Sequence, residues 1–138
     1  MGPGAEERVR DAAHLFDHAV NESAVRAFLS DERHHLLVAY VEENPAGFVS
    51  AVELLHPDKV KPEAFLYELG VDPAFRRMGV ATALLSELIR LCRERGCGEM
   101  FVLTDEANEA ALATYQKAGG RREPDQLMFY WDWSVDES

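Results

Sequence analysis

The chain has 138 residues, 47% of them hydrophobic, and a formal net charge of −11 at neutral pH. This size predicts one domain over residues 1–138 with a single hydrophobic core, and the acidic balance argues against nucleic-acid binding, which needs a basic surface. No apolar run approaches the roughly 20 residues of a membrane span, and the polar N-terminus does not resemble a secretory signal, so we expect a cytoplasmic protein without membrane association.

The first half of the chain predicts two short helices and then three strands. Apolar residues at helical spacing indicate a helix over residues 7–20. Asn21 is suitable as the N-cap of a second helix over residues 22–29. A turn at residues 43–47 and a proline-containing loop at residues 56–63 divide the apolar runs that follow. The strands expected between these breaks are residues 34–41, 48–55 and 65–71.

The second half predicts helices that alternate with strands. Apolar side chains line one side of residues 80–95, and Gly96 follows as a helix stop. Asn108 is suitable as the cap of a further helix that runs to Lys117. An alternation with a period of two over residues 126–133 indicates a final strand. The other strand expected in this half is residues 99–104.

The predicted order of elements is typical of one mixed α/β sheet with flanking helices. The two cysteines, Cys92 and Cys97, lie at the end of an expected helix without ligand-like residues nearby. We therefore expect reduced thiols rather than a disulfide or a metal site, as in a cytosolic enzyme.

One stretch, residues 67–82, carries the strongest indication of function. It predicts a strand, a turn at Pro73 and then Arg76-Arg77-Met78-Gly79-Val80-Ala81 at the start of the long helix. Small residues allow a ligand to approach the backbone, and the first N–H groups of a helix have no intrahelical acceptor. Together with two guanidinium groups they favour a bound phosphate. The sequence here lacks the glycine spacing of dinucleotide and nucleoside-triphosphate loops.

This stretch resembles motif A of the GNAT superfamily of acetyl-CoA-dependent N-acetyltransferases, whose signature is Arg/Gln-x-x-Gly-x-Gly/Ala. A second similarity follows at the expected distance, in the helix that GNAT enzymes place after their fifth strand. The residues that carry it are Asn108, Ala111, Tyr115 and Gly119. The resemblance covers residues 36–133. It implies the GNAT fold, a central and mostly antiparallel sheet with splayed parallel strands and flanking helices.

Within the superfamily, residues 62–71 resemble the type I aminoglycoside 3-N-acetyltransferases, which carry an aromatic residue, an acid and Leu-x-Val before motif A. Residues 76–84 and the pair Thr104-Asp105 are also similar. One departure is Glu68, where the resistance enzymes carry the shorter aspartate. The family's usual first strand is also expected to be missing. Strand 34–41 would then be a sheet edge or an interface, which is compatible with a homodimer.

The resemblance implies direct acetyl transfer from acetyl-CoA to a primary amine, without a metal or a permanently bound cofactor. Glu68 would take a proton from the amine, directly or through one water, and an apolar strand would raise its pKa. A solvated glutamate on a half-exposed strand is the alternative. Tyr115 would protonate the departing thiolate. The residues expected to hold acetyl-CoA are the strand backbone at Leu69 and Val71, the residues Arg76, Arg77, Met78, Gly79, Val80, Ala81 and Thr82, and Asn108.

The acidity of the chain allows two interpretations. It can serve solubility alone, or it can attract a small cationic substrate. On the second interpretation the acceptor face carries Glu68, Asp105 and Asp132, although surface carboxylates are commonly just solvated. The tryptophans Trp131 and Trp133 fit a core better than a sugar-stacking surface.

Three functions therefore compete. The first is acetylation of an aminoglycoside antibiotic at its 3-amino group, which would confer antibiotic resistance. The second is acetylation of another amine, such as a polyamine, an amino acid or a protein N-terminus. The third is a degenerate domain that binds acetyl-CoA as a sensor. The intact set of Glu68, Arg76, Gly79 and Tyr115 argues against the third.

Overall fold

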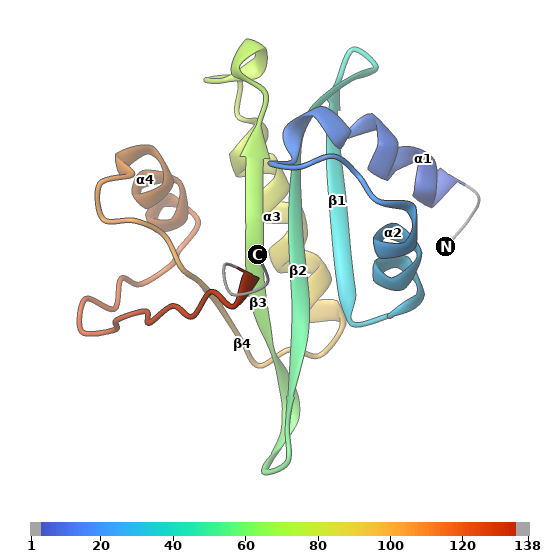
Figure 1. Ribbon diagram of the computed structural model, residues 1–138. Coiled ribbons are helices and arrows are strands. Elements are labelled where there is room, and N and C mark those ends of the chain that lie inside the picture. The colour runs from blue at the N-terminus through green and yellow to red at the C-terminus, as the bar shows by residue number, and fades with distance from the viewer. Residues whose placement is uncertain (1–3, 135–138) are drawn as a thin grey trace.

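The centre of the molecule is a mixed sheet, seen in a computed structural model that describes residues 4–134 (Figure 1). Four strands lie in the order β1-β2-β3-β4. The first three are antiparallel neighbours, whereas β4 runs parallel to β3. Their bounds are β1 His34–Val41, β2 Asn44–His56, β3 Lys59–Val71 and β4 Glu99–Val102. The expected mixed α/β sheet is confirmed.

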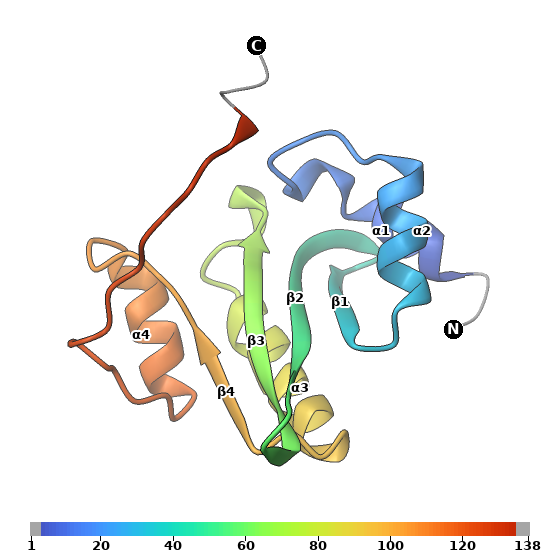
Figure 2. The ribbon, with the colours of Figure 1, turned by 60° about the horizontal axis from the view of Figure 1, so that its bottom comes forward.

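Helices flank the sheet on both faces and at the β4 edge. The N-terminal segment lies toward β1, α3 packs behind β2 and β3, and α4 stands beside β4 (Figures 1 and 2). The helices are α1 Gly4–Asp11, α2 Glu22–Ser30, α3 Val80–Glu94 and α4 Glu109–Lys117, with short 3₁₀ turns at η1 Ala13–Leu15 and η2 Pro73–Phe75. No helix among residues 4–134 has the length and apolar character that a bilayer crossing needs.

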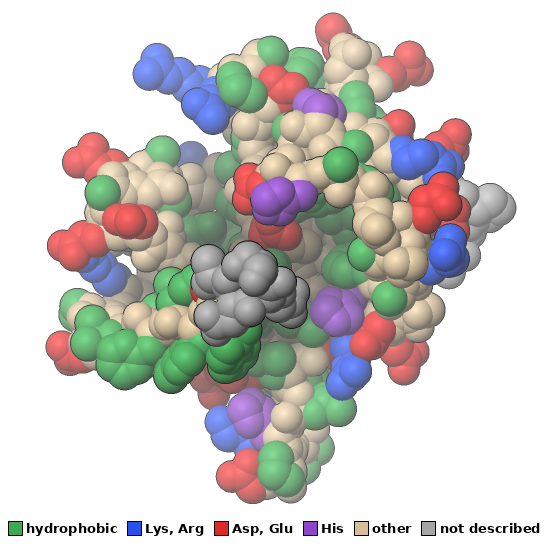
Figure 3. All heavy atoms as spheres, in the orientation of Figure 1, with side chains coloured by type: hydrophobic (Ala, Val, Ile, Leu, Met, Phe, Trp, Pro, Cys, Tyr) green, Lys and Arg blue, Asp and Glu red, His purple; other side chains and the backbone are tan. Residues whose placement is uncertain are grey.

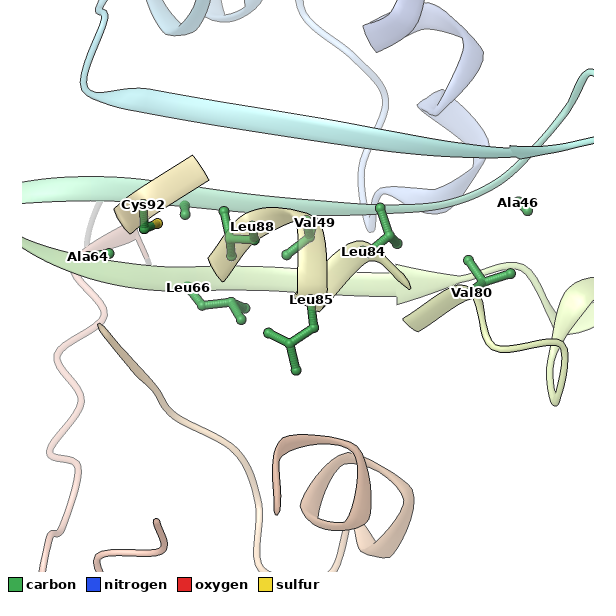
Figure 4. Close-up of a cluster of buried hydrophobic side chains, with 10 residues drawn as sticks. Ala46, Val49, Ala64, Leu66, Val80, Leu84, Leu85, Leu88 and Cys92 are labelled. Atoms are coloured by element: carbon green, nitrogen blue, oxygen red, sulfur yellow. The ribbon is translucent and has the colours of Figure 1, made fainter. Parts of the chain in front are cut away.

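The core lies between α3 and one face of β2 and β3 (Figure 4). Because side chains of a strand alternate between the two faces of the sheet, Val49 and Leu66 both point toward α3. Leu85 and Leu88, which share one side of that helix, meet them there. These four are the largest fully buried side chains of the described residues. Each such side chain contributes roughly 1.5–3 kcal/mol of hydrophobic stabilisation, so this layer fixes α3, and with it the start of α3, against the sheet.

The opposite face of the sheet is covered by the N-terminal segment. The Phe48 side chain lies on the opposite face of β2 from Val49. The ring of Phe16 packs edge-on against it, with ring centroids 4.7 Å apart. Phe28 of α2 lies 5.1 Å from the His34 ring at the start of β1. The N-terminal segment and α3 thus enclose the sheet from its two sides.

Helix caps predicted from asparagine residues are confirmed. The side-chain oxygen of Asn21 accepts a hydrogen bond from the Ala24 N–H at 3.1 Å, and that of Asn108 accepts from the Ala111 N–H at 3.1 Å. Gly96 follows the end of α3 with a φ of 85°, a left-handed conformation that glycine adopts without strain.

The single helix predicted over residues 7–20 is wrong in its extent. α1 ends at Asp11, η1 follows, and the chain then bends. Tertiary contacts account for the break: Phe16 packs on β2, and the His14 ring lies 3.1 Å from the Asp72 carboxylate.

Both loops predicted between the first three strands are wrong in position. The β1–β2 turn consists of Glu42 and Glu43, whose φ angles of 49° and 71° fit the two-residue hairpin turn. Residues 56–63 form a hairpin rather than a loop, because β2 and β3 continue to a turn at residues 57–58. Pro62 is tolerated in β3 because the strand register shifts beside it, between Leu54 and His56.

The final strand predicted over residues 126–133 is also wrong. The segment runs away from the sheet (Figure 2), and its only backbone hydrogen bond among the described residues joins the Gln126 N–H to the Glu123 oxygen. Trp131 and Trp133, expected in the core, are 66% and 71% exposed. A strand needs a neighbour to pair with, and this segment has none in the described part of the chain.

Two further expectations concern the cysteines and the first strand. Cys92 and Cys97 are both free, as predicted, and burial raises the pKa of the Cys92 thiol to about 11. The expected absence of a first strand falls largely on residues 1–3, which lie outside the described residues. Among residues 4–134 the first element is α1.

Candidate active site

A cleft opens where β3 and β4 separate. The two strands pair only from Glu63 and Glu99 to Leu66 and Val102, and β4 then ends while β3 continues to Val71. Figure 2 shows β4 leaning away from β3 toward α4. The resulting cavity has a volume of about 830 Å³ and is bounded by β3, the start of α3 and α4.

The free edge of β3 presents backbone N–H groups to this cleft. On its other edge, the Asp72 N–H donates to the Ala46 oxygen at 2.8 Å. Because successive N–H groups of a strand point to alternate edges, those of Leu69 and Val71 face the side that β4 has left. The structure therefore presents two hydrogen-bond donors of β3 to a ligand in the cleft.

An irregularity in β3 positions the candidate base. β2 pairs Ser50 with Glu68 but Ala51 with Leu66, so Tyr67 is an extra residue in β3. Such a bulge bends the strand and reorients nearby side chains, and bulges are frequent next to active sites. Here Tyr67 and Glu68 line the cleft at the bend.

Glu68 has the electrostatic surroundings of a proton acceptor. Its side chain is half-buried, and burial, assisted by the negative charge of Asp17, raises the pKa of its carboxyl above the ordinary value of 4.5. A raised pKa brings a carboxylate closer to neutral pH, where a general base works best. Glu68 is thus not a freely solvated strand residue.

The loop before α3 has the shape of an anion site. Arg77 and Gly79 both have left-handed backbones, with φ of 65° and 77°, and Gly79 caps α3 without any side-chain bond to the first N–H groups. Turns of this kind let successive N–H groups converge on an anion. Among the described residues neither the Arg76 nor the Arg77 guanidinium is paired with a carboxylate. The loop and helix residues lining the cleft are Arg76, Arg77, Gly79, Val80, Ala81 and Thr82.

Met78 was expected to contribute its backbone N–H group to the phosphate loop. The residue is 57% exposed and its side chain is not part of the cleft wall. The contribution of its N–H group stays a prediction.

Helix α4 supplies the opposite wall. Tyr115 is half-buried against the core, and burial raises the pKa of its phenol. Its hydroxyl makes no hydrogen bond within residues 4–134, so it is available to a ligand. Asn108 also lines the cleft. Its oxygen is engaged in the helix cap, which leaves its amide NH₂ free to donate.

The two other acidic residues singled out from the sequence lie outside the cleft. Asp105 accepts a hydrogen bond from the Ala107 N–H at 2.8 Å, and Asp132 accepts one from the Ser134 N–H at 3.0 Å. Each carboxylate stabilises its own turn on the surface. A role for either in acceptor binding stays a prediction.

Sequence reasoning missed a second cavity on the far side of Glu68. It has a volume of about 400 Å³ and lies between the N-terminal segment, α2 and the sheet. Its lining comes from separate segments of the chain, so no local pattern marks it. The one local signal is Ser50, a hydroxyl within the apolar run of β2.

Comparison with known proteins places the chain in a family. Residues 5–120 match the acetyltransferase (GNAT) family. The protein belongs to the GNAT acetyltransferases, whose members use acetyl-CoA, and the expected GNAT fold is confirmed.

The chain is similar to several individual proteins. Human (Homo sapiens) N-acetyltransferase 8 is 28% identical over 106 residues, which are 77% of this chain and 47% of that protein. The chain spans about half the length of the curated relatives that it matches first. An aminoglycoside acetyltransferase, HMB0005, from an uncultured soil metagenomic sample is 29% identical, with a TM-score of 0.78 and coverage of 94% of this chain and 91% of that one.

The fold is also shared with aminoglycoside N-acetyltransferase AAC(6′)-Iy, solved in complex with CoA. That structure is 22% identical, with a TM-score of 0.76, and covers 96% of this chain and 91% of its own.

Proposed function

We propose that the protein is an N-acetyltransferase that transfers the acetyl group of acetyl-CoA to a primary amine in a ternary complex. The observation that carries this proposal is the separation of β3 from β4, which brings Glu68, the loop before α3 and Tyr115 around one cleft. Glu68 and the loop belong to one stretch, residues 67–82, whereas Tyr115 comes from α4, and together they supply the groups that acetyl transfer requires.

The donor is expected to lie along the free edge of β3. The N–H groups of Leu69 and Val71 would bond the pantetheine arm as a neighbouring strand would, and one of them would polarise the thioester carbonyl. The start of α3 with Arg76 and Arg77 would hold the pyrophosphate. The Asn108 amide would contact the pantetheine region.

The proton transfers follow from the two titratable groups. An alkyl ammonium must lose a proton before its nitrogen can attack, and Glu68 would accept that proton, directly or through one water. The amine nitrogen then forms a bond to the thioester carbon, the carbon–sulfur bond breaks, and Tyr115 donates its proton to the departing thiolate. The nitrogen loses its second proton as the amide forms, and that proton restores the Tyr115 phenol. The raised pKa values of Glu68 and Tyr115 keep the first residue suited to accept a proton and the second protonated.

An aminoglycoside is one candidate acceptor. Its support is the sequence resemblance together with the aminoglycoside acetyltransferases that share the fold. Where the names of these enzymes give the acetylated amino group, it is the 6′-amino group. Acetylation at the 3-amino group is therefore supported by the sequence resemblance alone. Polyamines, amino acids and protein N-termini remain competing acceptors.

The test combines turnover with one conservative variant. Thiol release from acetyl-CoA is measured across aminoglycosides, spermidine, amino acid amides and arylalkylamines. Tyr115→Phe keeps the ring and removes the proton donor, so kcat should fall by about 10²- to 10⁴-fold while acetyl-CoA affinity is unchanged. Tyr130→Phe, at an exposed tyrosine outside both cavities, is the matched control. Acetyl-CoA binding by calorimetry without turnover of any amine would instead establish the sensor alternative.

A further inference from the structure

We infer that the second cavity binds the acceptor, and that this acceptor is a primary amine carried on an apolar, arylalkyl-sized body rather than a polycation. The inference rests on the proposed function and adds the chemical class of the substrate.

The second cavity adjoins the donor cleft at the β3 bulge. Tyr67 and Glu68 line both the donor cleft and the second cavity, so the β3 bulge is the junction between them. An amine at this junction lies beside the candidate base and faces the cleft where the thioester would lie. The remainder of the acceptor then extends into the second cavity, on the sheet face away from α3.

The walls of the second cavity are chemically suited to a single charge. They are built mainly from apolar side chains, among them Phe16, Val25, Phe28, Leu36 and Val52. Glu68 is the only carboxylate among the described residues that line it. An aminoglycoside or a polyamine would bring several further ammonium groups against these walls, and burying an unpaired charge is strongly unfavourable. One ammonium group on an apolar body meets no such penalty.

One buried polar group in the wall of this cavity, the Ser50 hydroxyl, lacks a partner among the described residues. Ser50 is only 7% exposed, its hydroxyl has no hydrogen bond among the described residues, and it lines the cavity. It lies directly opposite Glu68 in the β2–β3 register. An ammonium group has three donors; one can reach Glu68 and a second the Ser50 oxygen. The two residues together form a head-group site at the mouth of an apolar cavity.

The volume of the second cavity limits the size of the apolar part of the acceptor. A volume of about 400 Å³ equals the volume that about 13 water molecules occupy in the liquid, at roughly 30 Å³ each. This suits an amine of about a dozen non-hydrogen atoms, such as phenethylamine or tryptamine.

A matched pair of variants on α2 tests the inference. Ala24 and Ala27 are both exposed, but only Ala24 lines the cavity. Ala24→Phe should occupy the cavity and lower kcat/KM for phenethylamine and tryptamine at least tenfold, with acetyl-CoA affinity unchanged. Ala27→Phe should leave both values unaltered.

A second variant tests the head-group site. Ser50→Ala should weaken tryptamine binding roughly tenfold or more, because a hydrogen bond to a charged group is lost. The same change should raise the melting temperature of the free protein, since it removes an unpartnered buried hydroxyl. A purely structural serine would not move these two quantities in opposite directions.

The outcomes separate this inference from the proposed function. Efficient acetylation of spermidine or an aminoglycoside with no activity on the arylalkylamines would overturn the inference and leave the transferase intact. Equal effects of Ala24→Phe and Ala27→Phe would overturn it as well. If no amine is acetylated, calorimetric binding of tryptamine that Ala24→Phe abolishes would support the cavity assignment while the transferase proposal fails, and an absence of tryptamine binding would overturn the assignment.

Discussion

Among single residues, Glu68 shows a conflict between folding stability and the role of a general base. Its raised pKa means that the folded protein favours the protonated carboxyl. The stabilisation that protonation provides is complete below the ordinary pKa of 4.5 and is lost as pH rises through the raised value. Folding around the ionised carboxylate that a base requires is therefore less favourable than folding around the protonated carboxyl.

Glu68→Gln should separate the two effects. Glutamine resembles the protonated carboxyl but cannot accept the proton, so kcat should fall by about 10²- to 10⁴-fold and the acidic limb of the pH–rate profile should flatten. The melting temperature at pH 7 should equal or exceed that of the parent protein, and this difference should narrow below pH 4.5. Rate profiles and thermal melts over the same pH range measure both.

Asp17→Asn is the companion variant. It removes the negative charge that helps to raise the Glu68 pKa, so the acidic limb should move to lower pH with its plateau preserved. A limb that does not move would show that a different group controls the rate.

At the scale of elements, a buried ion cluster joins three parts of the fold. Glu53 of β2 is almost fully buried and accepts hydrogen bonds from the Arg95 Nε at 2.7 Å and the His35 Nε2 at 2.6 Å. Arg95 also donates a hydrogen bond to the backbone carbonyl oxygen of Glu32, which precedes β1. Burial alone would raise the pKa of Glu53, but the bonds from Arg95 and His35 outweigh it and lower that pKa.

Arg95→Met should therefore destabilise the protein by about 2–3 kcal/mol, because a buried carboxylate loses a charged partner. The stabilisation from a lowered pKa is present above pH 4.5 and is lost as pH falls through the lowered value, so the difference between variant and parent should shrink in acid. Urea unfolding at pH 7 and at pH 4 measures it. Arg90→Met, which removes exposed pairs with Glu87 and Glu94, should cost much less, because solvent screens exposed ion pairs. Equal losses for the two variants would contradict the role of the cluster.

Some helices, strands and loops could be predicted from the sequence and others could not. The Asn21 and Asn108 caps and the long helix α3 were predictable because their signals are local. Pro57 and Pro62 indicated a loop, but a register shift between β2 and β3 tolerates the second proline, and that shift is a property of the strand pair. The alternation over residues 126–133 marks a potential strand without revealing whether a neighbour exists. The residues proposed to hold acetyl-CoA were identified from motif resemblance, whereas the apolar cavity depends on side chains brought together only by folding.

Across the whole molecule, the largest group of exposed apolar side chains among the described residues belongs to the C-terminal segment. Apolar side chains there form a continuous band (Figure 3), and those of Leu127, Met128, Phe129, Tyr130, Trp131 and Trp133 are 66–84% exposed. Aromatic side chains bury about 150–250 Å² each, so two copies covering this segment reciprocally would bury roughly 1,200 Å² from their aromatic groups. That is the lower bound of a specific interface, about 1,200–2,000 Å².

We therefore expect self-association through this segment, in line with the homodimer that the sequence permits. Sedimentation velocity should show a dimer that dissociates on dilution, and Phe129→Ser with Trp131→Ser should shift the equilibrium to monomer. Val60→Ser, at the fully exposed Val60 of the β2–β3 hairpin, is the control and should not shift it. A monomer at all concentrations would contradict the expectation.

The short pairing between β3 and β4 has a consequence for local opening. β4 is held to the sheet by only four residue pairs, whereas β1, β2 and β3 pair along most of their lengths. Regions with few contacts open with a low free energy, and their amide hydrogens exchange rapidly with solvent. A donor bound along β3 and against α4 would resist that opening, and a ligand at 100 times its Kd stabilises the bound form by about 2.7 kcal/mol. Acetyl-CoA should therefore slow amide exchange in β4 and α4 by up to about a hundredfold, while exchange in β1 changes little. Uniform slowing across all four strands would mean that β4 opens only when the whole protein unfolds.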